Sequence, residues 1–409
     1  MHWYIVGLFI SGLIVNIDAL RHIPLYNDLG QVYLVNIGIG TPSQNFTVII
    51  DTQSSDLWVP SPHCKKSMCP VSRFQPQKST TFKSTDIPFG YYYGDGEING
   101  TYVKDTVILD GIQVRQQQFA LVNRVSKSVI AADAKRRDEH GGSSVSVQGV
   151  LGLGFPDLVQ VPTKYDPFFF SSSSGQDLNG VFSIYTNSIE EKGWSGELTL
   201  GGFNADKLKG SISFVSISPI STDGDDTTPP TYIMWVIRAQ SIGVSNIHRN
   251  KTTRKTSLPV QGKYVMIDTG TTLSYVGGLY ASQLVSALNT AYSRLDTKTG
   301  CYYVNCDLRH SKDMIDIDLA RYSTGTAGTV RIGIPVKDFI FDVAGDQCMF
   351  SICGHPKQEQ QKEMDTFIFG QSIIRSLYLV FDARNKQIGF ASPVHSSTTI
   401  VEIVNKTFL

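Results

Sequence analysis

The sequence predicts a mostly β protein whose chain folds into two lobes related by a pseudo-two-fold axis. Short runs of β-branched and aromatic residues recur along the 409 residues and are separated by Gly, Asn, Asp or Pro, which is typical of strands joined by turns. Helical periodicity is scarce by comparison. A short motif recurs in each half of the chain at matched spacing, and this internal repeat predicts the two lobes.

The strand signal is strongest at residues 32–35, 46–50, 106–109 and 377–381, where apolar β-formers are bounded by turn residues. The best helical signal covers residues 279–295, where apolar side chains recur every three or four positions. The sequence therefore predicts many strands and one clear helix.

The repeat consists of two Asp-Thr motifs, each at the end of an apolar run. Residues 50–54 read Ile-Asp-Thr-Gln-Ser, and residues 267–271 read Ile-Asp-Thr-Gly-Thr. A later apolar-apolar-Gly element follows each motif and ends at Gly152 and at Gly370. The interval from the aspartate to this glycine is 101 residues in the first half and 102 in the second. Each lobe is therefore expected to contribute one aspartate at the end of a strand.

Paired carboxylates make Asp51 and Asp268 the candidate catalytic residues. Two carboxylates within hydrogen-bonding distance cannot both ionise easily, because like charges repel in a site of low dielectric constant, so they hold one proton between them. The ionised partner can then deprotonate a bridging water, and the protonated partner can donate to a substrate carbonyl.

The neighbouring hydroxyl side chains are expected to support this pair. Thr52 and Thr269 can tie each turn to the opposite lobe. Ser54 and Thr271 can donate to the outer carboxylate oxygens and fix their orientation.

These motifs resemble those of the pepsin-like aspartic proteases over residues 33–393. The resemblance rests on residues 46–61, 93–96, 150–154, 265–271 and 380–391. Within the family the chain looks most like the mucorpepsin group of fungal secreted enzymes, because of residues 64–69 and 72–83. The resemblance implies the bilobal pepsin-like fold with the active cleft between its lobes. It also implies a secreted endopeptidase in which Asp51 and Asp268 activate water, polypeptides bind extended in the cleft, and no cofactor or metal takes part.

Residues 91–96 are assigned a second functional role by the same resemblance. Tyr93 becomes the aromatic residue of a β-hairpin flap that closes over bound peptide, with Gly94 and Asp95 at its turn, and Trp58 supports the flap tyrosine. The alternatives are an ordinary hairpin turn and a tryptophan that only fills the core.

The six cysteines fall into three pairs spaced five residues apart, and they permit fifteen connectivities. A zinc site built from the last four is the rival to disulfides. The resemblance implies the pairs Cys64–Cys69 and Cys306–Cys348. A second bridge between Cys301 and Cys353, nested outside the latter, is expected for the remaining two.

Three glutamines depart from the family pattern. Gln53 stands in the place of the glycine that Gly270 keeps in the second motif. Its side chain is expected to point toward the aspartates or the substrate groove, and its backbone to be strained if glycine-like dihedrals are needed. This leaves an alternative function, a catalytically impaired peptide-binding protein on the same fold. Gln148 and Gln371 stand where Asp is common, which should reduce the negative potential near the pair and alter the pH range of activity.

Composition narrows the class of protein further. The 36 basic and 36 acidic residues cancel, which argues against a nucleic-acid partner. Residues 1–19 look like a secretory signal, since their apolar run is too short for a membrane span, and no later stretch approaches 18 apolar residues. Asn45, Asn99, Asn250 and Asn405 begin glycosylation sequons, a further mark of export. A structural or lectin-like β protein has only the β composition in its favour.

The expected division of the chain follows from these features. Residues 1–19 are signal, 20–32 a vestigial prosegment or the lead-in to the first strand, 33–207 the N-terminal lobe, 208–393 the C-terminal lobe and 394–409 a frayed tail with no membrane anchor. The mature protein is expected to be a monomer.

Overall fold

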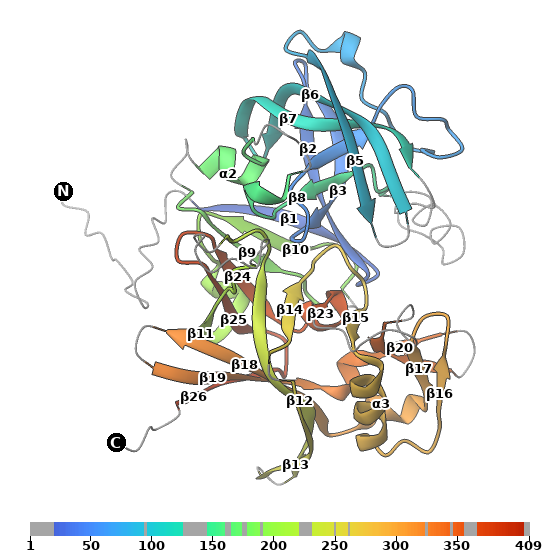
Figure 1. Ribbon diagram of the computed structural model, residues 1–409, viewed down its shortest axis with the longest axis vertical. Helices are drawn as coiled ribbons and strands as arrows, with labels where there is room; N and C mark the ends of the chain where they lie inside the picture. The colour runs from blue at the N-terminus through green and yellow to red at the C-terminus, as the bar shows by residue number, and fades with distance from the viewer. Residues whose placement is uncertain are drawn as a thin grey trace, which may run out of the picture.

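The computed structural model shows two β lobes joined by a sheet that runs between them (Figure 1). It describes residues 20–93, 96–125, 145–159, 165–173, 178–188, 191–220, 231–248, 251–260, 262–323, 326–343, 347–355 and 366–404. The expected signal peptide at residues 1–19 lies outside these ranges.

The largest sheet has 13 strands and extends from the N-terminal lobe into the centre of the molecule. Its order is β11 (Leu208–Ser216), β25 (Gln387–Pro393), β24 (Tyr378–Asp382), β9 (Val181–Tyr185), β10 (Gly193–Leu200), β1 (Arg21–Asp28), β2 (Val32–Ile39), β3 (Gln44–Asp51), β8 (Val150–Gly152), β4 (Leu57–Pro60), β7 (Ile112–Val125), β6 (Gly96–Leu109) and β5 (Lys83–Tyr93).

The central part of this sheet carries the pseudo-two-fold relation that the repeat predicts. β1, β9 and β10 come from the first half of the chain, and β11, β24 and β25 come from the second. The two sets meet where β9 and β24 pair antiparallel, from Tyr185 opposite Tyr378 to Val181 opposite Asp382. A continuous hydrogen-bonded sheet therefore joins the lobes.

The C-terminal lobe has two further sheets. A nine-stranded sheet contains β22 (Ile352–Gly354), β15 (Ser274–Val276), β23 (Thr366–Phe369), β14 (Tyr264–Ile267), β12 (Val236–His248), β18 (Asp313–Ser323), β19 (Thr326–Pro335) and β26 (Thr399–Val404), with β13 (Lys251–Pro259) paired to β12. A four-stranded sheet contains β16 (Ser293–Asp296), β17 (Cys301–Val304), β21 (Cys348–Phe350) and β20 (Ile340–Asp342).

The described α-helices are short. They are α2 (Phe168–Ser173), α3 (Gly278–Ala287) and α4 (Gln371–Ile374). None of the helices in the described ranges has the length and apolar character that spanning a bilayer requires.

The main hydrophobic core continues from one lobe to the other through Trp235. This indole is fully buried, and its ring centroid lies 4.5 Å from that of Phe155, 5.7 Å from Phe182 and 5.1 Å from Phe381. Aromatic rings from both halves of the chain thus pack around one side chain.

The four predicted strands are confirmed as β2, β3, β6 and β24, and the predicted helix only in part. α3 ends at Ala287, whereas the apolar spacing continues to residue 295. Asn289 adopts a positive φ of 52°, which ends a helix, and β16 begins at Ser293.

Both ends of the described chain are ordered in strands. Residues 21–28, within the segment expected to be a vestigial prosegment or the lead-in to the first strand, form β1, which pairs with β10 and β2. The expectation of a frayed tail at residues 394–409 is wrong for β26, which pairs antiparallel with β19 from Thr399 to Val404. Its Thr-Ile-Val-Glu-Ile-Val sequence has the β-branched residues that strands favour.

All six cysteines form disulfides: Cys64–Cys69, Cys301–Cys353 and Cys306–Cys348. The last two are nested, as the sequence suggested, and their sulfurs are therefore not zinc ligands.

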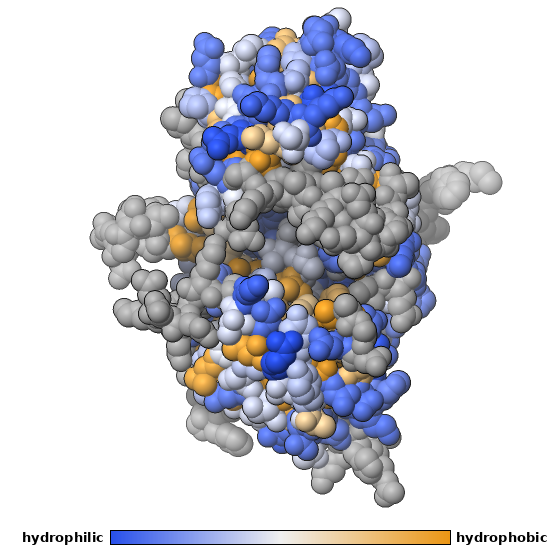
Figure 2. Space-filling model, turned by 90° about the vertical axis from the view of Figure 1, so that its right-hand side faces the viewer, coloured by the Kyte–Doolittle hydropathy of each residue, from blue (hydrophilic) through white to orange (hydrophobic). Residues whose placement is uncertain are grey.

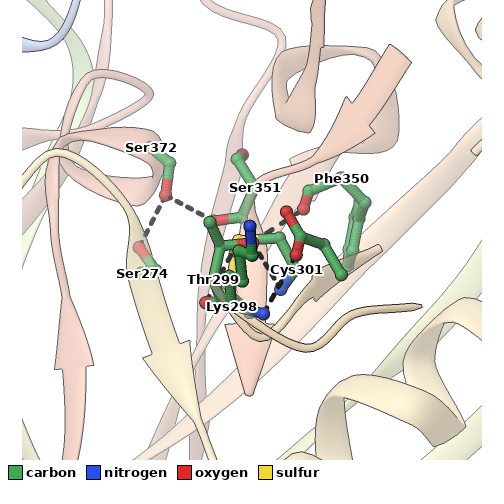
Figure 3. Close-up of a disulfide and its surroundings, with 9 residues drawn as sticks. Ser274, Lys298, Thr299, Cys301, Phe350, Ser351 and Ser372 are labelled. Atoms are coloured by element: carbon green, nitrogen blue, oxygen red, sulfur yellow. Dashed lines mark hydrogen bonds between the residues drawn. A yellow bond between two sulfur atoms is a disulfide. The ribbon is translucent and has the colours of Figure 1, made fainter. Parts of the chain in front are cut away.

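The segment beside Cys301 and Cys353 is linked by hydrogen bonds to the strand that follows the second repeat motif (Figure 3). The Ser372 hydroxyl lies 2.8 Å from that of Ser274 and donates to the backbone carbonyl of Ser351 at 3.1 Å. Ser274 in turn accepts a hydrogen bond from the Gly370 N–H at 3.1 Å. This serine chain connects the disulfide-bonded segment to the glycine of the second repeat.

Nesting makes a non-additive effect of disulfide removal testable. With Cys306–Cys348 intact, the outer bridge closes a loop of only about ten residues, so each single Cys→Ser pair should cost about 3 kcal/mol and both together about 7 kcal/mol. Urea unfolding measures these losses. A double loss no larger than the sum of the single losses would contradict the chain-entropy explanation.

Candidate active site

The two repeat motifs lie at matching strand ends. β3 ends at Asp51 and pairs parallel with β8, which brings Asp51 opposite Gly152. β14 ends just before Asp268 and pairs parallel with β23, whose last residue precedes Gly370. Side chains at these two glycines would not fit, because a Cβ on Gly152 would lie 2.4 Å from the Ser55 carbonyl carbon and one on Gly370 would lie 2.3 Å from the Leu273 oxygen.

Each aspartate accepts hydrogen bonds from two donors in its own turn, a backbone N–H two residues later and a side-chain hydroxyl three residues later. The Gln53 N–H and the Ser54 hydroxyl donate to the two carboxylate oxygens of Asp51 at 2.9 and 2.6 Å. The Gly270 N–H and the Thr271 hydroxyl donate to those of Asp268 at 2.9 and 2.6 Å. The two carboxylates are therefore equivalent in the hydrogen bonds that they accept from their own turns.

Thr52 and Thr269 tie the two turns together across the lobes. Each threonine N–H donates to the other's hydroxyl oxygen at 3.1 Å. The Thr52 hydroxyl donates to the Ile267 carbonyl at 2.5 Å, and the Thr269 hydroxyl donates to the Ile50 carbonyl at 2.8 Å. Both threonines are fully buried, so these four hydrogen bonds join the lobes in the interior, next to the two aspartates.

Burial and mutual repulsion disfavour ionisation of the pair. Burial is the main cause that raises the pKa of Asp51 above its ordinary value, and the hydrogen bonds from Ser54 and Gln53 act in the opposite direction. Burial first, and then the negative charge of Asp51, raise the pKa of Asp268 to about 7. The pair therefore retains a proton under conditions in which an ordinary aspartate is ionised.

The pair is closely packed on the side of Gly270. A Cβ added there would lie 2.9 Å from Cγ of Asp51, which no real Cβ contact allows without displacement. Glycine at this position therefore lets the second turn approach the first aspartate.

Of the two directions expected for the Gln53 side chain, the substrate groove is not the one taken, and the side chain reaches the strand end that carries Asp268. Only 7% of the residue is exposed, and its Nε2 donates to the carbonyl oxygens of Ile267 at 2.9 Å and Trp235 at 3.1 Å. The side chain thus enters the interface between the lobes instead of the substrate groove. The backbone of Gln53 does not adopt the positive φ that only glycine tolerates well, since Gln53 is not among the non-glycine residues with positive φ. The backbone strain considered for this position is therefore not found.

The two other glutamines differ in their relation to the pair. Gln371 is fully buried, and its Nε2 donates to the Thr269 carbonyl at 2.8 Å. Gln148 instead bonds Thr47, accepting from its N–H at 2.8 Å, four residues before Asp51 on β3. Gln371 therefore contacts the second motif directly. Gln148 instead bonds β3 just before the point where β3 pairs with β8, and it does not contact the first motif.

The hairpin of β5 and β6 lies beside the pair through Tyr91. Burial, followed by the charges of Asp51, Asp56 and Asp268, raises the pKa of the Tyr91 hydroxyl well above its usual range. The expected flap residues Gly94 and Asp95 lie outside the described ranges, as does the side chain of Tyr93.

Trp58 and Asp56 lie beneath this hairpin. Trp58 is fully buried in the cluster against which Tyr91 packs. Asp56 accepts hydrogen bonds from the hydroxyls of Tyr102 at 2.8 Å and Tyr165 at 2.6 Å. Sequence reasoning missed Asp56 and Tyr91, and the three adjacent tyrosines at 91–93 carry no local signal that singles out Tyr91.

The candidate glycosylation sites are only partly described. Asn45 on β3 is exposed and Asn99 on β6 is half-buried, whereas Asn250 and Asn405 lie outside the described ranges. Within the described ranges, no group of three His, Cys, Asp or Glu residues is placed to hold a metal ion.

Fold and site together define a bilobal β protein with an aspartate pair between its lobes, and the surface is hollowed between them (Figure 2). A model of the eukaryotic aspartyl protease family matches residues 32–393. The chain belongs to this family, whose pepsin-like members the motifs resemble.

Individual relatives agree with this assignment. Cathepsin E of Aquarana catesbeiana is 29% identical over 382 residues, covering 92% of this chain and 83% of the relative. Mucorpepsin of Rhizomucor miehei is 28% identical over 384 residues, covering 91% and 81%. The crystal structure of an aspartic proteinase from Irpex lacteus matches with a TM-score of 0.69 at 21% identity, covering 93% of this chain and 99% of that one, which supports the fold. Family membership supports a proteolytic function, and the fold implies peptide substrates bound in the cleft.

The interlobe threonine bonds make a stability prediction. Thr52→Val removes the acceptor for the buried Thr269 N–H, so the free energy of unfolding should fall by about 1–3 kcal/mol. Urea unfolding measures the loss. Thr47→Val is the matched control, because its hydroxyl bonds Asn36 at an exposed site, and it should change stability by less than about 0.5 kcal/mol. Equal losses in the two variants would contradict the role given to Thr52.

Proposed function

We propose that the protein is a secreted aspartic endopeptidase in which Asp51 and Asp268 activate a water molecule. The observation that carries the proposal is the pair of carboxyl groups, buried at Asp51 and half-buried at Asp268, each with an N–H and a hydroxyl donor from its own turn and with a raised pKa. Such a pair offers an acid and a base in one site.

The chemistry divides between the two carboxyl groups. The ionised carboxylate takes a proton from a water held between the residues, and the oxygen of that water attacks the scissile carbonyl carbon. The protonated carboxyl donates its proton to the carbonyl oxygen, which gives a neutral tetrahedral intermediate. The carboxyl that took the proton from water then gives it to the amide nitrogen, and the other carboxylate takes a proton from one hydroxyl of the intermediate. The carbonyl reforms as the C–N bond breaks, which releases the amine and the carboxylic acid and leaves the pair with one proton.

Gln53 is compatible with this chemistry. Its N–H keeps the hydrogen bond to Asp51 that Gly270 makes to Asp268, and its side chain leaves the cleft. The structure therefore favours activity over the alternative of an impaired peptide-binding protein, which becomes an outcome of the test below.

Substrate and location follow from the same features. A cleft between β lobes suits a polypeptide in extended conformation, which can pair its backbone with flanking strands. The β5–β6 hairpin supports a covering role for residues 91–96, because the charges of Asp51 and Asp268 act on the Tyr91 hydroxyl. Three disulfides fit an oxidising compartment outside the cytosol, in keeping with the signal-like residues 1–19.

Cleavage of denatured globin at about pH 3–6 tests the function. The parent protein should produce fragments, and a peptide inhibitor that mimics the tetrahedral intermediate should stop this. Asp51→Asn and Asp268→Asn should each lower kcat by at least about a thousandfold, because either change removes the acid–base pair. A folded parent that binds the inhibitor without cleaving globin would instead be the peptide-binding protein.

The raised pKa values predict how activity depends on pH. Activity should fall as pH rises through about 7, where Asp268 loses the shared proton, and should fall again at low pH as the second carboxyl is protonated. A pH–rate profile of kcat/KM measures both limbs. An alkaline limb below about pH 5 would contradict the proposed shift.

The same shift has a consequence for stability. The pKa of Asp268 is raised from its ordinary value of 3.8 to about 7, so the folded state binds an extra proton between these values. The free energy of unfolding should therefore fall as pH rises through this window, by at most about 4 kcal/mol, and Asp268→Asn should lack this fall.

A further inference from the structure

Gln53 connects the catalytic turn of one lobe to the backbone of the other. Its Nε2 donates to the Ile267 carbonyl at 2.9 Å and to the Trp235 carbonyl at 3.1 Å. The two acceptors are 214 and 182 residues away in sequence, so both bonds cross from the first half of the chain to the second.

The Ile267 carbonyl is a critical acceptor because it directly precedes Asp268. It receives the Thr52 hydroxyl at 2.5 Å as well as the Gln53 amide. The equivalent carbonyl in the first lobe, Ile50, receives the Thr269 hydroxyl at 2.8 Å, and Gly270 has no side chain to add. The backbone that positions Asp268 is thus held by one more donor than the backbone that positions Asp51.

Trp235 makes the connection reciprocal. Its indole N–H donates to the Leu153 carbonyl of the first lobe at 2.9 Å, while its own carbonyl accepts from Gln53. Since the indole also packs on Phe155 and Phe381, the two hydrogen bonds fix a rigid aromatic group between the lobes.

A mirrored arrangement in the second lobe is sterically excluded. A Cβ on Gly270 would lie 2.9 Å from Cγ of Asp51 and 3.0 Å from its Oδ1. A side chain can therefore cross the interface from position 53, but the same change at position 270 would displace a carboxyl group of the pair.

We propose that Gln53 is a positioning residue that clamps the Asp51 turn to the strand end carrying Asp268 and so fixes the relative placement of the two carboxyl groups. The proposal rests on the endopeptidase function proposed above. It gives position 53 a role that glycine cannot perform. Its Oε1 is buried and accepts no hydrogen bond within the described part of the chain, so the interactions found for the amide come from its donor group.

The test compares two volume-conserving substitutions, Gln53→Met and Gln117→Met. Gln117 is the matched control: it is 3% exposed, its Nε2 donates to the carbonyls of Gln118 at 3.0 Å and Asp166 at 3.1 Å, and its Oε1 is likewise buried without a partner among the described residues. Its acceptors lie in the first half of the chain. Gln117→Met therefore removes two side-chain-to-carbonyl hydrogen bonds, as Gln53→Met does, but neither of them crosses between the lobes.

Both variants should unfold a few degrees below the parent, because each loses two buried hydrogen bonds. Only Gln53→Met should lower kcat, by about tenfold with KM changed less than about twofold, since the clamp acts on the reacting groups and not on peptide binding. Hydrogen exchange of the amides in residues 50–57 and 265–274 should be faster by about tenfold in Gln53→Met alone.

Unchanged kcat and unchanged exchange in Gln53→Met would overturn the clamp, as would an equal loss of kcat in Gln117→Met. If the parent protein itself cleaves no globin, the endopeptidase proposal fails. The exchange comparison still decides between a clamp and an ordinary buried glutamine.

Discussion

The reciprocal hydrogen bonds between Thr52 and Thr269 are the constraint on which the site depends. Two carboxylates repel each other, so a fold that holds them together must join the segments that carry them. Here each threonine binds the other's backbone and the strand end opposite. The antiparallel pairing of β9 with β24 and the ring contacts of the buried Trp235 join the same two halves of the chain.

The chemistry follows from that closeness. Burial raises the pKa values of Asp51 and Asp268, and the negative charge of Asp51 raises that of Asp268 further, while the donors in each turn fix the carboxylate oxygens in place. The pseudo-two-fold relation makes the two residues alike in their local bonds. Gln53 breaks this equivalence, because its amide reaches the carbonyl before Asp268 and no side chain at position 270 can do the same.

The strands and the paired motifs were predictable because their signals are local. The run that becomes β3 is apolar and β-branched, and the matched glycines at 152 and 370 reflect a backbone approach that allows no Cβ. The interlobe bonds of Thr52 and Thr269 also follow from the repeat, once the two halves are taken to face each other.

Other features depend on residues that are distant in sequence. The direction of the Gln53 side chain is set by Trp235, whose position only the folded chain reveals. The pairing of β26 with β19 could not be read from a short polar-flanked segment at the end of the chain. The proximity of Tyr91 to the pair likewise requires the hairpin to be placed over the cleft, since three adjacent tyrosines offer the same local signal.

The central claim is that one aspartate from each lobe forms a single site with a shared proton. Isothermal titration calorimetry with a peptide inhibitor that places a hydroxyl between the two carboxyl groups, at about pH 4.5, tests it most directly. The expected result is one inhibitor per chain for the parent protein and a loss of affinity of at least about a hundredfold in both Asp51→Asn and Asp268→Asn. Retention of the parent's affinity by either variant would contradict the claim.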